Sequence, residues 1–137
     1  MIQFRLDPHS GVSTYLQIVH QVRHALRLGM LQPGDQLPTV KEVVGSLAIN
    51  PNTVLKAYRE LEHEGLAEGR PGVGTFVRRT LASASLESQA GLRADLVAWL
   101  GRAQEAGLTG EDVLALVETT MRAALADVKG DGHGSRD

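Results

Sequence analysis

Two helix-start signals lie close together near the middle of the chain, and they constrain its fold more than any other feature. Thr39 and Glu42 have the spacing of a capping box, in which the two side chains close the first turn of a helix. Asn50 followed by Pro51 is a second start, because asparagine is a good N-cap and proline is favoured at the first helical position. Gly65 is expected to end the second helix. The pattern predicts two short helices joined by a tight turn.

A further helix is predicted before this pair. Residues 2–6 are expected to form a short edge strand, and the helix then begins at Ser13 or Thr14, since Thr14 and Gln17 have capping-box spacing. Gly29 ends it. Its buried face is predicted from apolar residues that recur at helical period, which are Tyr15, Ile18, Val19, Val22 and Leu26.

The pattern changes after the second helix of the pair. Residues 66–68 and 75–77 are predicted as strands, and the turn between them spans residues 70–74. Three helices followed by a β-hairpin are typical of a winged helix-turn-helix. We therefore expect residues 1–79 to form such a domain.

Two more helices are predicted in the rear part of the chain. Residues 80–91 are rich in Ser and Ala and are expected to be a linker or the first turn of a helix. One helix then covers about residues 92–106. The other follows Thr109, whose spacing to Asp112 is another capping box. The fold class is thus mainly α with a small β-hairpin.

These two rear helices are amphipathic and too short to bury their apolar faces alone. Residues 80–128 are therefore expected to pair two copies of the chain, with room for an unidentified small-molecule effector. Trp99 and Met121 could line such a pocket, although a place in the core or interface is the stronger expectation. The predicted dimerisation residues are Leu92, Leu96, Trp99, Leu100, Val113, Val117 and Met121. The Gly-rich, charged tail over 129–137 is predicted to be disordered.

Charge is distributed unevenly along the chain. Residues 1–80 carry nine Lys and Arg against seven Asp and Glu, and residues 81–137 carry five against nine. This distribution fits a protein that meets a polyanion at its front end. The chain has no cysteine, no apolar run long enough to span a membrane and no apolar signal-peptide core at its start, so a cytoplasmic location is expected.

The helix that begins at Asn50 has two distinct faces. At 100° per residue, Val54, Ala57, Tyr58 and Leu61 share the side expected to pack into the domain. The opposite side carries amide and basic groups that suit base edges and phosphates in a major groove, and the glycines of the hairpin turn allow close approach to a minor groove. The predicted DNA-binding residues are Lys41, Asn50, Asn52, Thr53, Lys56, Arg59, Arg70, Gly72, Gly74 and Thr75.

Several segments resemble the GntR family of bacterial regulators, and in particular its short YtrA-like subfamily. Residues 31–39, LQPGDQLPT, resemble the family's segment before the second helix. Residues 50–54, NPNTV, and 57–62, AYRELE, resemble the recognition helix of that subfamily, the helix that reads the DNA bases. Residues 72–77, GVGTFV, are similar to the family's wing, and Tyr15 with residues 17–18, QI, matches its first helix.

The resemblance implies a homodimer that binds a two-fold symmetric operator, usually as a repressor and often of ABC-transporter genes. It also implies that the two rear helices pair the protomers. Lys41 stands where the family commonly has an arginine that contacts DNA. Pro51 stands where many relatives have Arg or Lys, and Ser13 replaces a proline. The first two departures bear on base preference, and the third bears on the start of the helix.

An enzyme or metal-binding protein is a competing interpretation of the sequence. His20 and His24 are four residues apart, as metal ligands can be, yet no third ligand has a clear spacing to them. Neither a phosphate-binding P-loop nor a paired-carboxylate signature is present, so no enzyme, metal or cofactor is expected. The roughly 60 residues after the wing are too few for the aminotransferase-like domain of some GntR relatives. A winged-helix module that binds protein or RNA without operator specificity remains the alternative.

Overall fold

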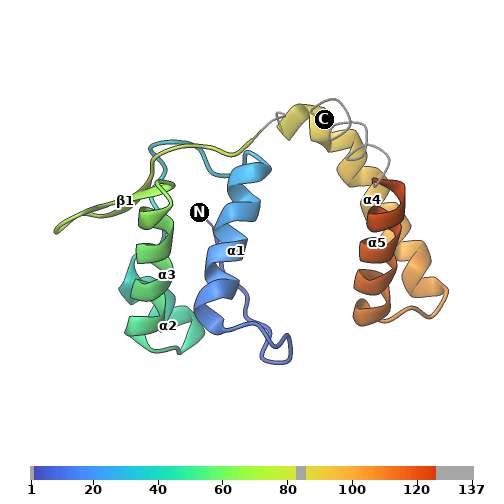
Figure 1. The fold of residues 1–137 in the computed structure, drawn as a ribbon, viewed down its shortest axis with the longest axis horizontal. Helices are drawn as coiled ribbons and strands as arrows, with labels where there is room; N and C mark the ends of the chain where they lie inside the picture. Colours follow the sequence, from blue (N-terminus) through green and yellow to red (C-terminus); the bar gives the residue numbers. More distant parts are fainter. Residues whose placement is uncertain (1, 83–85, 126–137) are drawn as a thin grey trace, which may run out of the picture. The chain divides into compact units, whose positions relative to one another are not determined.

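In the computed structural model of the chain, residues 2–82 and 86–125 are described, and the predicted tail lies outside them. The chain divides into two compact units, Met1–Gln89 and Ala90–Asp137. The described residues form five helices and one two-stranded antiparallel hairpin, which confirms the predicted fold class (Figure 1). None of these helices combines the length and apolar character that crossing a membrane requires.

The two predicted helix starts are confirmed in the first unit. Helix α2 covers Val40–Leu47 and begins with the reciprocal capping box of Thr39 and Glu42. Helix α3 covers Pro51–His63, and the Asn50 side chain accepts a hydrogen bond from the backbone N–H of Asn52 at 2.8 Å. The turn between the helices passes through Ala48 in the left-handed conformation, with φ of 54°. That conformation costs a non-glycine residue about 1–2 kcal/mol.

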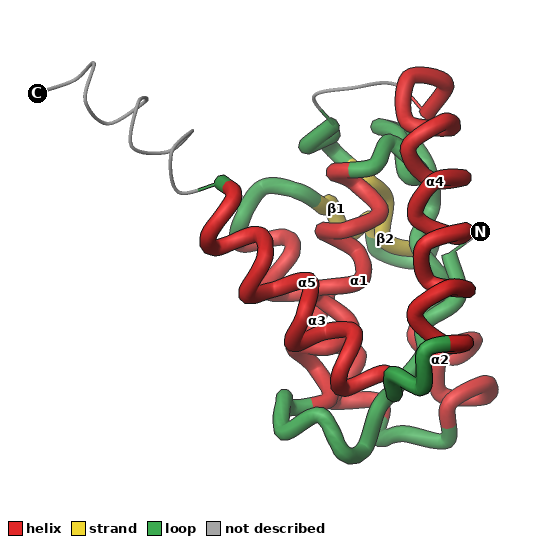
Figure 2. The backbone as a smooth tube through the Cα atoms, turned by 90° about the vertical axis from the view of Figure 1, so that its right-hand side faces the viewer, coloured by secondary structure: helices red, strands yellow, loops and turns green. Residues whose placement is uncertain are grey.

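Helix α1, Thr14–Arg27, packs against α3 and builds the core (Figure 2). The faces predicted from helical periodicity are buried on both helices, apart from Tyr15, which is only partly buried. The fully buried side chains include Ile18, Val19, Val22, Leu26, Leu37, Val43, Val54 and Leu61. The position of α3 between the core and solvent follows from this packing.

The N-terminal segment differs from the prediction. Residues 2–6 do not form a strand, because glutamine side chains of α1 take the place of a partner strand. Gln21 accepts from the backbone N–H of Arg5 and donates to its carbonyl, at 2.9 and 2.6 Å. Gln17 makes the same pair of bonds with Asp7, and its amide therefore does not complete a capping box with Thr14. The N-cap of α1 is Ser13, whose side chain makes no capping hydrogen bond.

The hairpin consists of β1, Ala67–Arg70, and β2, Gly74–Val77. Arg70 pairs with Gly74 in the ladder, so it ends a strand and is not part of the turn as predicted. The segment before α2 lies along the other edge of β2: Leu37 N–H donates to the Thr75 carbonyl at 2.8 Å, and Gln36 forms a bridge with Phe76. This contact ties the hairpin to the helices.

The second unit contains most of α4, Leu86–Glu105, and all of α5, Gly110–Ala124. The capping box of Thr109 and Asp112 at the start of α5 is confirmed. Helix α4 begins at Leu86, not near Leu92 as expected. The intervening residues include Leu, Glu, Gln and Ala, which favour helix and let it extend toward the N-terminus.

The buried Tyr58 on α3 has a hydroxyl group with a strongly raised pKa. It donates a hydrogen bond to the Pro38 carbonyl. Burial, and secondarily the negative charge of Glu42, raise the pKa of Tyr58 well above its ordinary value of 10.0. Below pH 10, the ordinary pKa of tyrosine, the hydroxyl is mostly protonated in both the folded and the unfolded chain. Above this pH the unfolded chain releases the proton while the folded chain keeps it, so the free energy of unfolding falls as pH rises.

Replacement of Tyr58 by phenylalanine should remove this alkaline loss. We expect Tyr58→Phe to be about 1–3 kcal/mol less stable at neutral pH, because the Pro38 carbonyl loses a buried donor. Its free energy of unfolding should then fall less steeply than that of the parent between about pH 9 and 11, where unperturbed tyrosine titrates. Urea denaturation across this range measures both quantities. Parallel curves for the two proteins would contradict the assignment.

Candidate nucleic-acid interface

The solvent-facing side of α3 carries amide and basic side chains. Asn52, Lys56 and Arg59 are exposed, and Thr53 is partly buried beside them. The opposite side of the helix is anchored in the core, so these side chains are presented by a fixed backbone. Asn50, predicted with them, has its side-chain oxygen engaged in capping the helix. Asn50 therefore orients the first turn of α3.

Lys56 has a partner that sequence analysis did not anticipate. Its Nζ lies 4.1 Å from the centroid of the Tyr15 ring, which α1 supplies. A cation over an aromatic face is attracted by the ring's negative charge density. The contact restricts the lysine side chain and joins α1 to the exposed face of α3. Tyr15 was expected only as a buried apolar residue.

Lys41 is the second residue of α2 and is exposed. The capping box around it fixes the first turn of α2. The structure therefore holds this lysine on a defined backbone, and an ammonium group there can reach a phosphate.

The tip of the hairpin is glycine-rich for two different reasons. Gly72 has φ of 75°, the left-handed region, and nothing lies near the place of a Cβ. Gly74 has φ of 146°, and a Cβ there would lie 2.5 Å from Nε2 of Gln36. That amide donates to the Val73 carbonyl at 3.3 Å. Gln36 thus supports the tip, a role that no sequence pattern indicated.

Arg70 has two contacts on the face of the hairpin. Its guanidinium carbon lies 4.3 Å from the centroid of the Phe76 ring, and Nη2 lies 3.5 Å from a carboxylate oxygen of Glu68. The side chain is still 53% exposed. It can exchange the glutamate for a phosphate, at the cost of that weak surface pair. Thr75, on β2 beside it, is partly buried, and its carbonyl accepts from Leu37.

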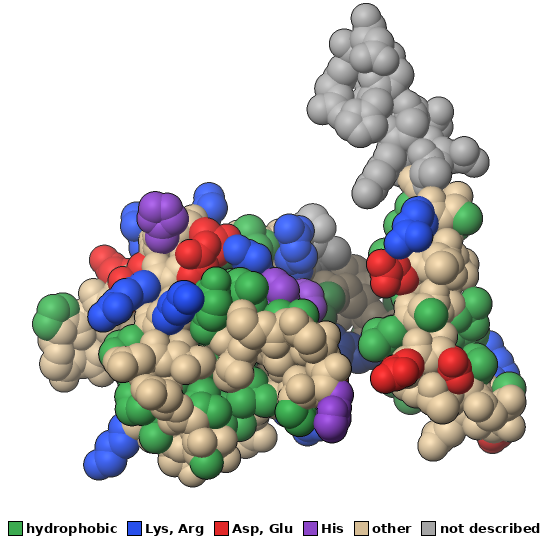
Figure 3. Space-filling model, turned by 60° about the horizontal axis from the view of Figure 1, so that its bottom comes forward, with side chains coloured by type: hydrophobic (Ala, Val, Ile, Leu, Met, Phe, Trp, Pro, Cys, Tyr) green, Lys and Arg blue, Asp and Glu red, His purple; other side chains and the backbone are tan. Residues whose placement is uncertain are grey.

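Lys and Arg side chains do not gather into one continuous basic patch in the view of Figure 3. Those of the first unit are scattered among hydrophobic and acidic side chains.

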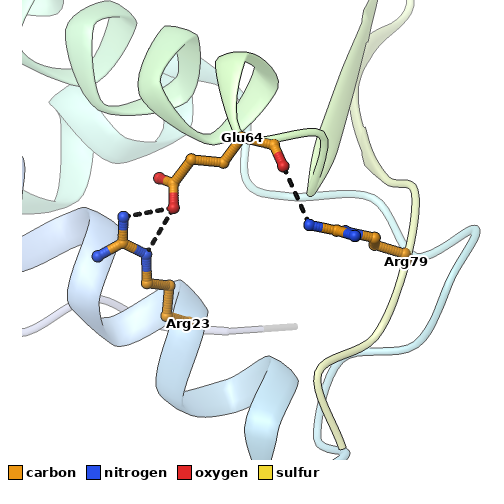
Figure 4. A network of polar contacts seen from close by, with 3 residues as sticks. All are labelled: Arg23, Glu64 and Arg79. Carbon is orange, nitrogen blue, oxygen red and sulfur yellow. Dashed lines mark hydrogen bonds and ion pairs between the residues drawn. The ribbon is translucent and has the colours of Figure 1, made fainter.

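A polar network closes the far end of α3 (Figure 4). The Arg23 guanidinium donates twice to one carboxylate oxygen of Glu64, and Arg79 donates to the Glu64 carbonyl at 3.2 Å. Thr80 donates its hydroxyl to the Leu26 carbonyl at 3.2 Å. The chain leaving the hairpin is therefore fastened to the C-terminal ends of both α1 and α3.

The second unit exposes a large part of its apolar face. Among the predicted dimerisation residues, Leu92 is 71% exposed and Leu96 is 50% exposed. Leu100 and Met121 are also exposed, whereas Trp99, Val113 and Val117 are partly buried. Hydrophobic side chains are visible on the surface of this unit in Figure 3. Two helices leave this face uncovered, as their sequence predicted.

Neither histidine of the alternative metal site is buried. His20 and His24 are both exposed on α1, and the described residues contain no group of three or more potential metal ligands.

Comparison with known proteins gives one consistent family. Residues 14–77 match the family model described as bacterial regulatory proteins, gntR family. The chain is 40% identical over 89 residues to the HTH-type transcriptional repressor YtrA of Bacillus subtilis strain 168, covering 65% of this chain and 67% of that protein. It is 36% identical over 110 residues to the HTH-type transcriptional regulator Rv1152 of Mycobacterium tuberculosis, covering 80% and 87%.

Solved structures agree with this comparison. A transcriptional antiterminator from Listeria monocytogenes EGD-e superposes with a TM-score of 0.55 at 28% identity, covering 86% of this chain and 89% of that one. YtrA from Sulfolobus acidocaldarius, a GntR-family transcription factor, has a TM-score of 0.51 at 24% identity, covering 86% and 96%, and shows the shared fold. The family and these two sequence relatives are described as transcription regulators.

Proposed function

Because the chain belongs to the GntR family of bacterial transcription regulators, we propose that it is a repressor that binds a two-fold symmetric operator as a homodimer. Residues 1–79 are the DNA-binding domain in this proposal, and residues 80–128 pair the protomers. The working location is the cytoplasm, where bacterial DNA is read. The relative named as a repressor supports the direction of regulation.

The observation that carries the proposal is the exposed face of α3. Asn52 can make two hydrogen bonds to adenine, and Lys56 or Arg59 can bond guanine or phosphate. Helix α3 is joined to α2 by a tight turn and carries these groups near its N-terminus, an arrangement that suits the major groove. Thr53 adds a hydroxyl beside them. Lys41 would contact phosphate from α2, while Gly72, Gly74, Thr75 and Arg70 would bring the hairpin to the minor groove.

The test is selection of bound duplexes from a random DNA library with the full chain. We expect a two-fold symmetric consensus, and an affinity that falls steeply with salt because phosphate contacts release counterions. Asn52→Ala should lose discrimination at one base pair in each half-site, by about 1–3 kcal/mol. Lys41→Ala should weaken all sequences alike. Recovery of no consensus, with binding to RNA or protein instead, would favour the alternative module.

Arg70 and Glu68 have opposite charges, so neutralising each in turn should change DNA binding in opposite directions. We expect Arg70→Ala to weaken operator binding several-fold and to reduce the salt dependence by about one counterion. Its folding stability should fall by less than about 1 kcal/mol, because both of its contacts are at the surface. Glu68→Gln should instead strengthen binding, since it releases the guanidinium from its carboxylate.

Fluorescence anisotropy at two salt concentrations measures both variants. The double variant separates the two effects. In the Arg70→Ala background, Glu68→Gln should increase the operator affinity less than it does in the parent. Unchanged affinity of Arg70→Ala at both salt concentrations would show that Arg70 does not contact DNA.

We further propose control of transporter genes, of the ABC class that the subfamily implies, and a small-molecule effector bound by residues 80–128. The regulated genes are identified as those whose transcripts rise when the regulator is deleted. An effector is identified as a compound that weakens the complex of the protein with a selected operator.

A further inference from the structure

A hydrophobic side chain, that of Leu55, lies at the edge of the polar face of α3. At 3.6 residues per turn, Leu55 is about 60° from Asn52 and about 40° from Arg59 around the helix axis. It is therefore a neighbour of the two side chains that would read base edges. On its other flank, the buried Tyr58, Val54 and Leu61 lie about 60°, 100° and 120° away, so Leu55 lies at the boundary between the polar and the buried face.

Leu55 does not serve the core. Its side chain is partly exposed, and it is not among the described partly buried hydrophobic residues that pack against the core. Its stability contribution is accordingly small. Among the base edges in the major groove, thymine alone presents a methyl group, and apolar side chains recognise it by contact.

We propose that Leu55 packs against the C5 methyl group of a thymine in each half-site and sets a preference for thymine there. The inference rests on the proposed function, because it requires α3 to lie in the major groove. Asn52 lies one turn before Leu55 and Arg59 one turn after it. These two side chains would bond base edges, and Leu55 would exclude water beside them. The side chain thereby determines specificity without making a hydrogen bond.

The experiment replaces single thymines by deoxyuridine in a selected operator, which removes the methyl group and keeps every hydrogen-bonding group. Binding of the full chain and of Leu55→Ala is measured for each duplex. At one thymine of each half-site, the parent should lose about fourfold in affinity on replacement by uracil, the effect of removing one buried methyl-sized group. Leu55→Ala should bind the thymine and uracil forms equally at that position.

Leu28→Ala is the matched control, since Leu28 is a 38% exposed leucine at the C-cap of α1. It should keep the parent's ratio of thymine to uracil affinities, and Leu55→Met should keep most of it. Identical ratios in the parent and Leu55→Ala at every thymine would overturn the inference while leaving the proposed function standing. Failure to select any operator would overturn both. An unfolded Leu55→Ala, seen by circular dichroism, would place Leu55 in the core and also overturn the inference.

Discussion

Leu96→Glu combined with Met121→Glu is expected to dissociate the proposed homodimer and to weaken operator binding by about a hundredfold or more. The two side chains are 50% and 52% exposed on the apolar face of the second unit, where a partner would have to bury the new carboxylates. A dimer holds its second half-site at a high effective concentration, and a monomer loses that gain of about 10²–10⁴. Sedimentation velocity at micromolar concentration and anisotropy on a two-half-site operator measure the two effects.

A matched control places the same two charges elsewhere. Leu28→Glu with Met30→Glu changes two exposed apolar residues of the first unit, which are 38% and 55% exposed. This variant should stay dimeric and lose affinity only through its added charge. If the Leu96 and Met121 variant also stays dimeric, these two side chains do not lie in the dimer interface.

Leu61→Ala is expected to lower the free energy of unfolding by about 2–5 kcal/mol, because it leaves a cavity among fully buried side chains. Small domains are stable by only about 5–15 kcal/mol, so a loss of this size lowers the melting temperature considerably. Urea denaturation at one fixed protein concentration is the appropriate measurement, since the proposed dimerisation would contribute to the apparent stability. Leu55→Ala is the control on the same helix and should cost less than about 1 kcal/mol. Equal losses would contradict the assignment of the two faces of α3.

Three of the five described helix starts were predicted correctly from their N-caps, because capping is a local interaction, whereas the Thr14 capping box and the start of α4 were not. Thr39, Asn50 and Thr109 each cap the helix assigned to them. Helical periodicity similarly identified the buried face of α3. The side chains on the opposite face were therefore expected to face solvent. The candidate DNA-binding residues on α3 depended only on that periodicity.

Contacts between distant segments were not predictable in this way. Residues 2–6 were expected to be a strand, but the side chain of Gln21 on α1 satisfies the backbone of Arg5, and nothing in residues 2–6 themselves indicates that contact. Tyr15 meets Lys56, and Gln36 meets the tip of the hairpin, across separations of 41 and 37 residues. No local pattern encodes such pairs. The functional surface therefore has supports that only the folded arrangement reveals.

The fastening of the chain after β2 has a mechanical consequence. Arg79 and Thr80 are hydrogen-bonded to the last turns of α3 and α1, and Leu81 packs against the core. Tension applied along the backbone beyond residue 81 is consequently borne by two helix ends before it reaches β2. These contacts should therefore protect the register of the hairpin from force transmitted along the chain.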